Sequence, residues 1–180
     1  LNSQPQSRVA EWVQSRRADI GIVSLTIPNT SVDARELMTR DAMCVFPAHH
    51  PLATRELIRA EELADLPFVS FPRGTPFRFQ TDMLFERAGI ERQMMTEAAT
   101  HEAVCNLIAA DLGVGIVSPF SPHLRRNPAL AFRQFKPAMP ITIGMLADEG
   151  TLSVAARAFY DFVLEEVGQM KGAAQTAAAK

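Results

Sequence analysis

The sequence predicts an α/β fold. Short apolar runs of strand length alternate along the chain with segments whose apolar residues recur at helical spacing. The chain of 180 residues is long enough to bury a substantial core, and no internal repeat or low-complexity linker divides it. Strands that alternate with helices imply a mostly parallel sheet, in which ligands bind at the carboxyl ends of the strands.

The composition is typical of a globular protein, with 47% hydrophobic and 21% charged residues. The net charge is -2 with both signs interspersed, so no basic surplus indicates nucleic-acid binding. No apolar stretch is long enough for a transmembrane helix, and the first residues do not form a signal peptide. We therefore expect a cytoplasmic protein without a membrane segment. Cys44 and Cys105 lie in apolar runs, as buried thiols do.

The first half of the chain is predicted from local signals. Ser3 followed by Pro5 indicates a helix start, and an apolar stripe continues to about Arg17. Short apolar runs predict buried strands, prolines end them, and Gly89 is expected as the left-handed cap of a helix. The elements expected after the first helix are strands at 18–24, 32–38 and 41–48, a short helix at 59–67, a strand at 68–72, a helix at 77–88 and a strand at 93–99.

The second half continues the alternation. Thr100 is predicted to cap a helix whose apolar side chains share one face as far as Leu112. A final amphipathic helix is expected from about Val154 to about Gly168, followed by a mobile tail. Between these helices, three proline positions predict a loop, and the strands are expected at 113–119, 130–135 and 141–147.

Two adjacent histidines, His49 and His50, invite a metal site or a proton relay. Neighbouring side chains on an extended chain point to opposite faces, so the pair does not easily chelate one metal. The other histidines, His101 and His123, show no useful spacing to this pair for zinc. A structural turn is therefore favoured, and no metal or cofactor is predicted.

No motif supports catalysis. The segment HEAVC at residues 101–105 begins like a zinc-protease helix, but Cys105 replaces the second histidine that the motif needs. The GVG at 113–115 lacks a third glycine and enters a strand, so it is not a dinucleotide-binding loop. No nucleophile elbow occurs, and no Ser or Cys has a histidine and an acid in an interpretable order. We predict that the chain is not an enzyme.

Polar side chains gather at strand ends and helix starts. Helix N-termini carry free N–H groups and partial positive charge, and these bind carboxylates. Taken singly, Ser3 and Thr100 are about as well explained as helix caps, but their joint placement after strands favours ligand binding. The predicted ligand-binding residues are Ser3, Ser24, Ser70, Arg73, Thr75, Thr100 and His101.

Four segments also carry a family resemblance. They read RRADIGIVS, MCVFPAHHPLA, AEELADLPFVSFPRG and AVCNLIAADLGVGIVSP, in this order along the chain. Each is weak alone, but the ordered set resembles the C-terminal effector-binding domain of LysR-type transcriptional regulators over about residues 1–168. In this resemblance His50 begins a turn, and that turn comes just after the chain crosses from one lobe to the other. The resemblance therefore implies a structural role for His50.

The resemblance implies a two-lobed fold similar to type 2 periplasmic binding proteins, each lobe a mixed sheet flanked by helices. Lobe one would comprise 1–46 and 138–180, lobe two 47–137, and a small effector would bind between them. The predicted ligand-binding residues match the positions where family members usually hold their ligand. Arg73 and the helix N-termini favour a carboxylate, as in an organic acid or amino acid.

The sequence departs from the family pattern at its start. No winged helix-turn-helix precedes Leu1, so DNA would be bound only through a domain absent from this chain. The strand, helix and strand that normally open the effector domain are also missing, which suggests a truncated chain lacking one loop with ligand contacts. Self-association as a dimer or tetramer is expected. A free-standing solute-binding protein of the same fold is the alternative, and a small α/β enzyme ranks third.

Overall fold

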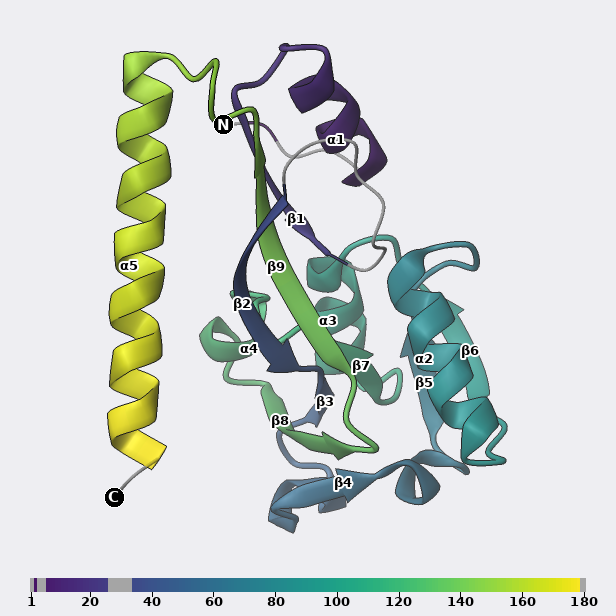
Figure 1. Cartoon of the computed structure of the whole chain (residues 1–180). Coiled ribbons are helices and arrows are strands. Elements are labelled where there is room, and N and C mark those ends of the chain that lie inside the picture. The colour runs from purple at the N-terminus through teal and green to yellow at the C-terminus, as the bar shows by residue number, and fades with distance from the viewer. Residues whose placement is uncertain (1, 3–5, 26–33, 179–180) are drawn as a thin grey trace. The chain divides into compact units, whose positions relative to one another are not determined.

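The structure is a computed structural model that describes residues 2, 6–25 and 34–178 (Figure 1). It divides into two compact units. Unit 1 comprises Leu1–Thr39 and Thr142–Lys180, and unit 2 comprises Arg40–Ile141. Since the two boundaries fall inside strands, the chain passes between the units within β2 (Ala34–Asp41) and again within β9 (Pro140–Ala147).

Unit 1 is built on a three-stranded sheet in the order β1-β9-β2. β1 runs antiparallel to β9, with Ile20 opposite Ala147 and Ser24 opposite Ile143. The apolar stripe of α1 buries Val13 against this sheet. The remaining elements of unit 1 are α1 (Gln6–Gln14), β1 (Ile20–Ser24) and α5 (Val154–Ala178).

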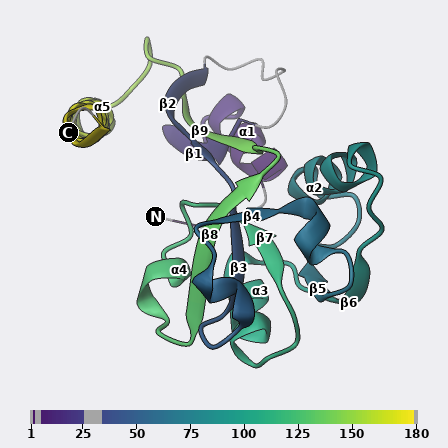
Figure 2. The same ribbon diagram turned by 90° about the horizontal axis from the view of Figure 1, so that it is seen from below.

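Unit 2 contains a four-stranded sheet in the order β4-β8-β3-β7 and a two-stranded sheet of β5 and β6. Figure 2 shows α2 beside β5 and β6. The elements are β3 (Met43–Pro47), η1 (Pro51–Thr54), β4 (Leu57–Arg59), η2 (Ala60–Leu63), β5 (Pro67–Ser70), α2 (Pro76–Arg87), β6 (Gln93–Glu97), α3 (His101–Ala109), β7 (Gly115–Val117), α4 (His123–Arg126) and β8 (Leu130–Lys136).

The core of unit 2 is aromatic and aliphatic. Phe46, Phe68, Phe85 and Phe135 are almost completely buried, because the short apolar runs of the sequence place them on inward faces of strands and of α2. The ring of Phe85 stacks on that of Phe135 at 5.7 Å and meets the edge of Phe68 at 5.7 Å. These contacts join α2 to both sheets of the unit.

The prediction of a mostly parallel sheet is wrong. β1 with β9, β3 with β7 and β3 with β8 are antiparallel, whereas β4 with β8 and β5 with β6 are parallel. The reason is the path of the chain. It enters unit 2 through β2, continues into β3, and leaves the unit after β8 through β9. Two neighbouring strands that carry the chain in and out of a unit run in opposite directions. The mixed sheets implied by the family resemblance are therefore present.

Several boundaries also differ from the sequence expectations. The predicted helix at 59–67 is only the 3-10 turn η2, and β4 before it was not predicted. α5 continues past Gly168 to Ala178 because Gly weakens a helix without ending it, and the alanines that follow favour a helix. The local caps are confirmed: Gly89 has φ of 69°, and Thr100 is the N-cap of α3.

Gly113 is the position where the fold most clearly requires glycine. Its φ is 136°, and a Cβ there would lie 2.1 Å from the carbonyl oxygen of Pro67. That oxygen accepts a hydrogen bond from Val114 N at 2.8 Å, which fixes it in place. The backbone of the loop before β7 therefore approaches β5 more closely than any side chain allows.

We expect Gly113→Ala to lower the free energy of unfolding by about 3 kcal/mol or more, because strain at positive φ adds to a backbone clash. Gly74→Ala is the matched control, since Gly74 also has positive φ (86°) but no atom within 4 Å of its added Cβ. It should cost only about 1 kcal/mol. Urea unfolding followed by circular dichroism measures both values, and equal losses would contradict the clash.

Candidate ligand-binding site

Two loops of unit 2 meet at one edge of the parallel pair formed by β5 and β6. Ser70 at the end of β5 lies opposite Glu97 at the end of β6, and Ala98 N donates to the carbonyl oxygen of Ser70 at 2.9 Å. Because parallel strands end at the same edge, the loops that follow them lie side by side. α2 and α3 begin directly after these loops, so both helix N-termini open at this edge.

Both predicted threonines are helix caps. Thr75 Oγ1 accepts a hydrogen bond from Arg78 N at 3.3 Å and donates to the carbonyl oxygen of Pro72 at 2.9 Å. Thr100 Oγ1 accepts from Ala103 N at 3.1 Å. These hydroxyls therefore fix the first turns of α2 and α3.

His101 is a neutral aromatic residue in this site. Its ring contacts the rings of Phe71 and Phe77, with centroid distances of 4.6 and 5.3 Å. Nδ1 accepts a hydrogen bond from Ser118 N at 3.4 Å, so the proton of the neutral ring is on Nε2. Burial lowers the pKa of His101 to about 4 because the charged form loses its hydration. At neutral pH this side chain offers one N–H donor.

Arg78 connects the two loops, and sequence reasoning missed it. Its buried guanidinium donates from Nη1 to the carbonyl oxygen of Phe71 at 2.8 Å and to Glu97 Oε1 at 2.6 Å. Nε donates to Asp82 Oδ1 at 2.7 Å. The spacing of four residues between Arg78 and Asp82 was the available signal, because it places both side chains on one helix face.

Arg73 is exposed at the start of the loop before α2 and lines a cavity of about 530 Å³ together with Arg78 and Arg92. Arg92 contacts the faces of Phe68 and Phe85 and pairs with Asp82. Burial, and secondarily the charge of Arg78, lowers the pKa of Arg92 to about 10. The cavity is charge-balanced, since three acidic residues line it as well: Asp82, Glu86 and Glu91.

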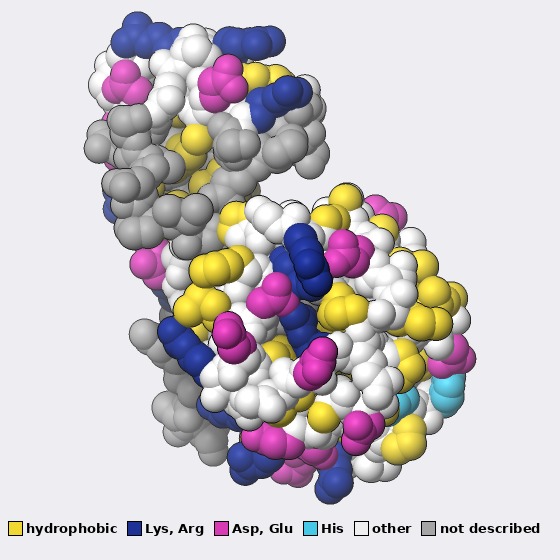
Figure 3. Space-filling view, turned by 90° about the vertical axis from the view of Figure 1, so that its right-hand side faces the viewer, with side chains coloured by type: hydrophobic (Ala, Val, Ile, Leu, Met, Phe, Trp, Pro, Cys, Tyr) yellow, Lys and Arg dark blue, Asp and Glu magenta, His cyan; other side chains and the backbone are white. Residues whose placement is uncertain are grey.

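The predicted ligand-binding residues are thus distributed unequally. Ser70, Arg73, Thr75, Thr100 and His101 lie on the adjoining loops of unit 2. Ser24 ends β1 of unit 1, where it is half-buried, and Ser3 lies outside the described residues. On the face of unit 2 shown in Figure 3, acidic and basic side chains are interspersed.

The two adjacent histidines belong to a turn. His50 Nδ1 accepts a hydrogen bond from Leu52 N at 3.2 Å and so caps η1. His49 Nε2 lies 3.1 Å from Asp111 Oδ1, and both side chains are largely exposed. Among the described residues, no group of three or more His, Cys, Asp or Glu side chains is placed to hold a metal ion.

The cysteine thiols are buried, as predicted. Burial raises the pKa of Cys44 far above its usual range and that of Cys105 to about 11. Both thiols are therefore protonated at neutral pH, which makes them poor nucleophiles. In the part of the chain that the structure describes, no helix has the length and hydropathy needed to span a bilayer.

The sequence of this chain matches a known family. The family model for the LysR substrate binding domain matches residues 1–168, and the chain belongs to this family. The chain is 27% identical over 148 residues to the transcriptional activator protein LysR of Escherichia coli, which covers 81% of this chain and 48% of that protein. It is also 27% identical over 141 residues to the regulatory protein NocR of Agrobacterium tumefaciens, covering 78% and 47%.

The chain spans about half the length of these curated relatives, which are named as a transcriptional activator and a regulatory protein. Solved structures of the family share its fold. The LysR family regulator HinK of Pseudomonas aeruginosa gives a TM-score of 0.77 at 16% identity, over 94% of this chain and 60% of that one. The effector-binding domain of QuiR in complex with shikimate gives 0.76 at 20% identity, over 92% and 79%. The fold is therefore the two-lobed, periplasmic-binding-like fold of these domains.

The burial of His101 predicts a pH-dependent stability. The pKa is 6.5 for an ordinary histidine and about 4 in the folded chain, so the unfolded state binds more protons between these values. The stabilisation is complete above pH 6.5 and is lost as the pH falls towards 4. The loss reaches up to about 3 kcal/mol.

Urea unfolding of the parent and of His101→Gln at several pH values tests this expectation. The variant should be less stable at pH 7 and should show a shallower loss of stability between pH 6.5 and 4, because its side chain does not titrate. Parallel curves for the two proteins would show that His101 titrates in the same way in the folded and unfolded chain.

Proposed function

We propose that this chain is the effector-binding part of a bacterial LysR-type transcriptional regulator, and that a winged helix-turn-helix outside this chain binds DNA. The family match over residues 1–168 carries this proposal, and relatives from several bacteria are named as transcriptional regulators. The regulator acts in the cytoplasm, where its DNA is, and self-associates as a dimer or tetramer. In this proposal the two compact units serve as the two lobes of the effector-binding domain.

The mechanism is a shift of populations without chemistry. An effector that binds one conformation of the regulator more tightly than another moves the equilibrium towards it, and DNA affinity changes by linkage. This mechanism requires no catalytic group. A free-standing solute-binding protein of this fold is the alternative, and the regulators among the relatives favour the first function.

The proposed effector is a small organic acid or amino acid held by its carboxylate. A carboxylate that leaves water needs donors in return. The loops after β5 and β6 offer the N-termini of α2 and α3, the N–H of His101 and the guanidinium of Arg73. Ser24 and Ser3 belong to the same proposal for unit 1. The QuiR domain was solved with shikimate and the CcmR domain with 2-PG, so small ligands are known for related folds.

Calorimetry of the full-length protein against a panel of organic acids and amino acids tests this proposal. A direct charge-assisted contact is worth roughly 1.5–3 kcal/mol, so Arg73→Gln should weaken the tightest ligand by about 10- to 150-fold. Arg40→Gln is the matched control, because Arg40 is equally an exposed arginine but lies on β2. It should leave the affinity unchanged.

The variant Thr100→Val distinguishes the contribution of the Thr100 hydroxyl to ligand affinity from that of the N-terminus of α3. The variant keeps the side-chain shape and loses the cap that holds Ala103 N, so we expect a smaller loss of affinity than for Arg73→Gln. If the tightest ligand is uncharged, or if Arg73→Gln binds as well as the parent, the carboxylate assignment is wrong.

A further inference from the structure

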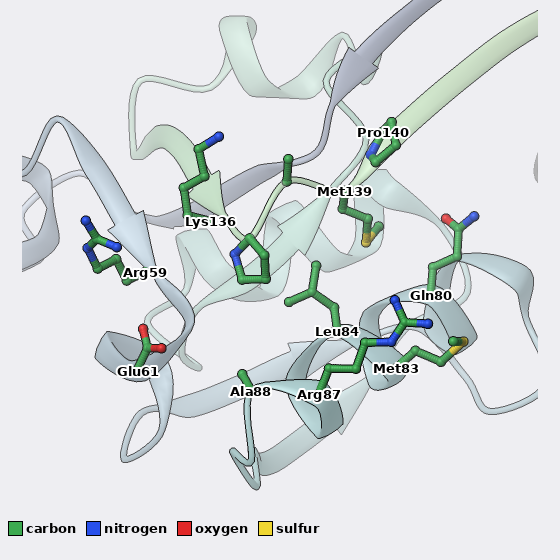
Figure 4. A pocket seen from close by; sticks show the side chains of 12 residues that line it. Arg59, Glu61, Gln80, Met83, Leu84, Arg87, Ala88, Lys136, Met139 and Pro140 are labelled. Carbon is green, nitrogen blue, oxygen red and sulfur yellow. The ribbon is translucent and has the colours of Figure 1, made fainter.

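Unit 2 contains another cavity that shares no lining residue with the predicted ligand-binding set (Figure 4). Its volume is about 620 Å³, within the range of small-molecule sites. Three parts of the unit form it: the end of β4 with the start of η2, one face of α2, and the segment 136–140 between β8 and β9. All of its walls therefore belong to one unit.

The floor of this cavity is apolar. Leu84 and Met139 are buried members of the unit 2 core, and Met83 is half-buried beside them. Pro137 and Ala138 complete the apolar wall and are exposed. A ligand that covered these side chains would remove hydrocarbon surface from water, which favours binding in proportion to the apolar area buried.

The rim of the cavity is cationic. Arg59, Arg87 and Lys136 come from β4, α2 and β8, and Glu61 is the one acidic residue in the lining, so the formal charge is +2. None of the three cations forms an ion pair with a described carboxylate. Figure 4 shows Arg59 and Lys136 on one side of Leu84 and Arg87 on the other. The cavity beside Arg73 differs, because its three arginines are matched by three acidic residues.

We propose that this cavity is a second small-molecule site, which takes an amphipathic organic anion. The carboxylate lies at the cationic rim that Arg59, Arg87 and Lys136 form around the floor, and the hydrocarbon body lies over Leu84 and Met139. A neutral apolar ligand would leave the three cations without a counter-charge, and a cationic ligand would be repelled. A polyanion without an apolar body would leave the floor exposed to water.

Methionine methyl NMR of the full-length protein reads this site directly, with octanoate as the probe. Two of the eight methionines, Met83 and Met139, line the cavity. Their methyl signals, assigned with Met83→Leu and Met139→Leu, should shift saturably, while those of Met94 and Met145 stay in place. Affinity should rise from butanoate to octanoate by about fourfold per CH₂. Octan-1-ol should bind at least about tenfold more weakly than octanoate, because it lacks the charge.

Charge-removing variants test the rim. Arg87→Gln should weaken octanoate by about two- to fivefold, as expected for one exposed cation. The triple variant Arg59→Gln, Arg87→Gln, Lys136→Gln should weaken it by more than about tenfold. Arg40→Gln, which lies outside the cavity, should bind octanoate like the parent.

Three results would overturn the proposal: octan-1-ol that binds as tightly as octanoate, a triple variant that binds like the parent, or shifts that miss Met83 and Met139. The assay needs no effector and no DNA. Failure here would therefore leave the proposed regulatory function untouched, and failure of the carboxylate panel at Arg73 would leave this site untouched.

Discussion

The guanidinium of Arg78 is the interaction on which the candidate site depends. It is buried, yet it serves acceptors from three parts of unit 2: the loop after β5, the end of β6 and the next turn of α2. Only arginine offers enough donors in a fixed planar fork to reach three directions at once. Asp82 is shared with Arg92, whose guanidinium covers the rings of Phe68 and Phe85, so the polar network is anchored on the aromatic core.

This anchoring explains how residues from two separate loops can form one ordered site. The carbonyl of Phe71 and the carboxylate of Glu97 belong to neighbouring strand ends, and one side chain holds both. The start of α2 is thereby fixed beside the start of α3. The neutral ring of His101 packs against the rings of Phe71 and Phe77. Donors that are fixed before binding cost less entropy when a ligand arrives. The proposed recognition of a carboxylate relies on this order.

The features that could be predicted from the sequence are those that depend on a residue and its immediate neighbours. Thr100 as a cap, Gly89 at positive φ and the buried thiols follow from residue type and immediate neighbours. Strand direction did not follow, because it depends on where the chain enters and leaves each unit. Arg78 was missed since two of its partners lie 7 and 19 residues away. The rim of the second cavity was missed for the same reason: Arg59, Arg87 and Lys136 line one cavity only in the folded chain.

We propose that the loops held by Arg78 form the effector-binding surface of unit 2. Amide NMR of the full-length protein, titrated with its tightest organic acid or amino acid, tests this claim most directly. The amides of residues 70–79, apart from the two prolines, and of residues 97–104 should show the largest shifts within unit 2, since these segments contain the strand ends and the first turns of both helices. If the signals of these amides do not shift while the ligand saturates the protein, the effector binds elsewhere and the loops held by Arg78 are not its binding surface.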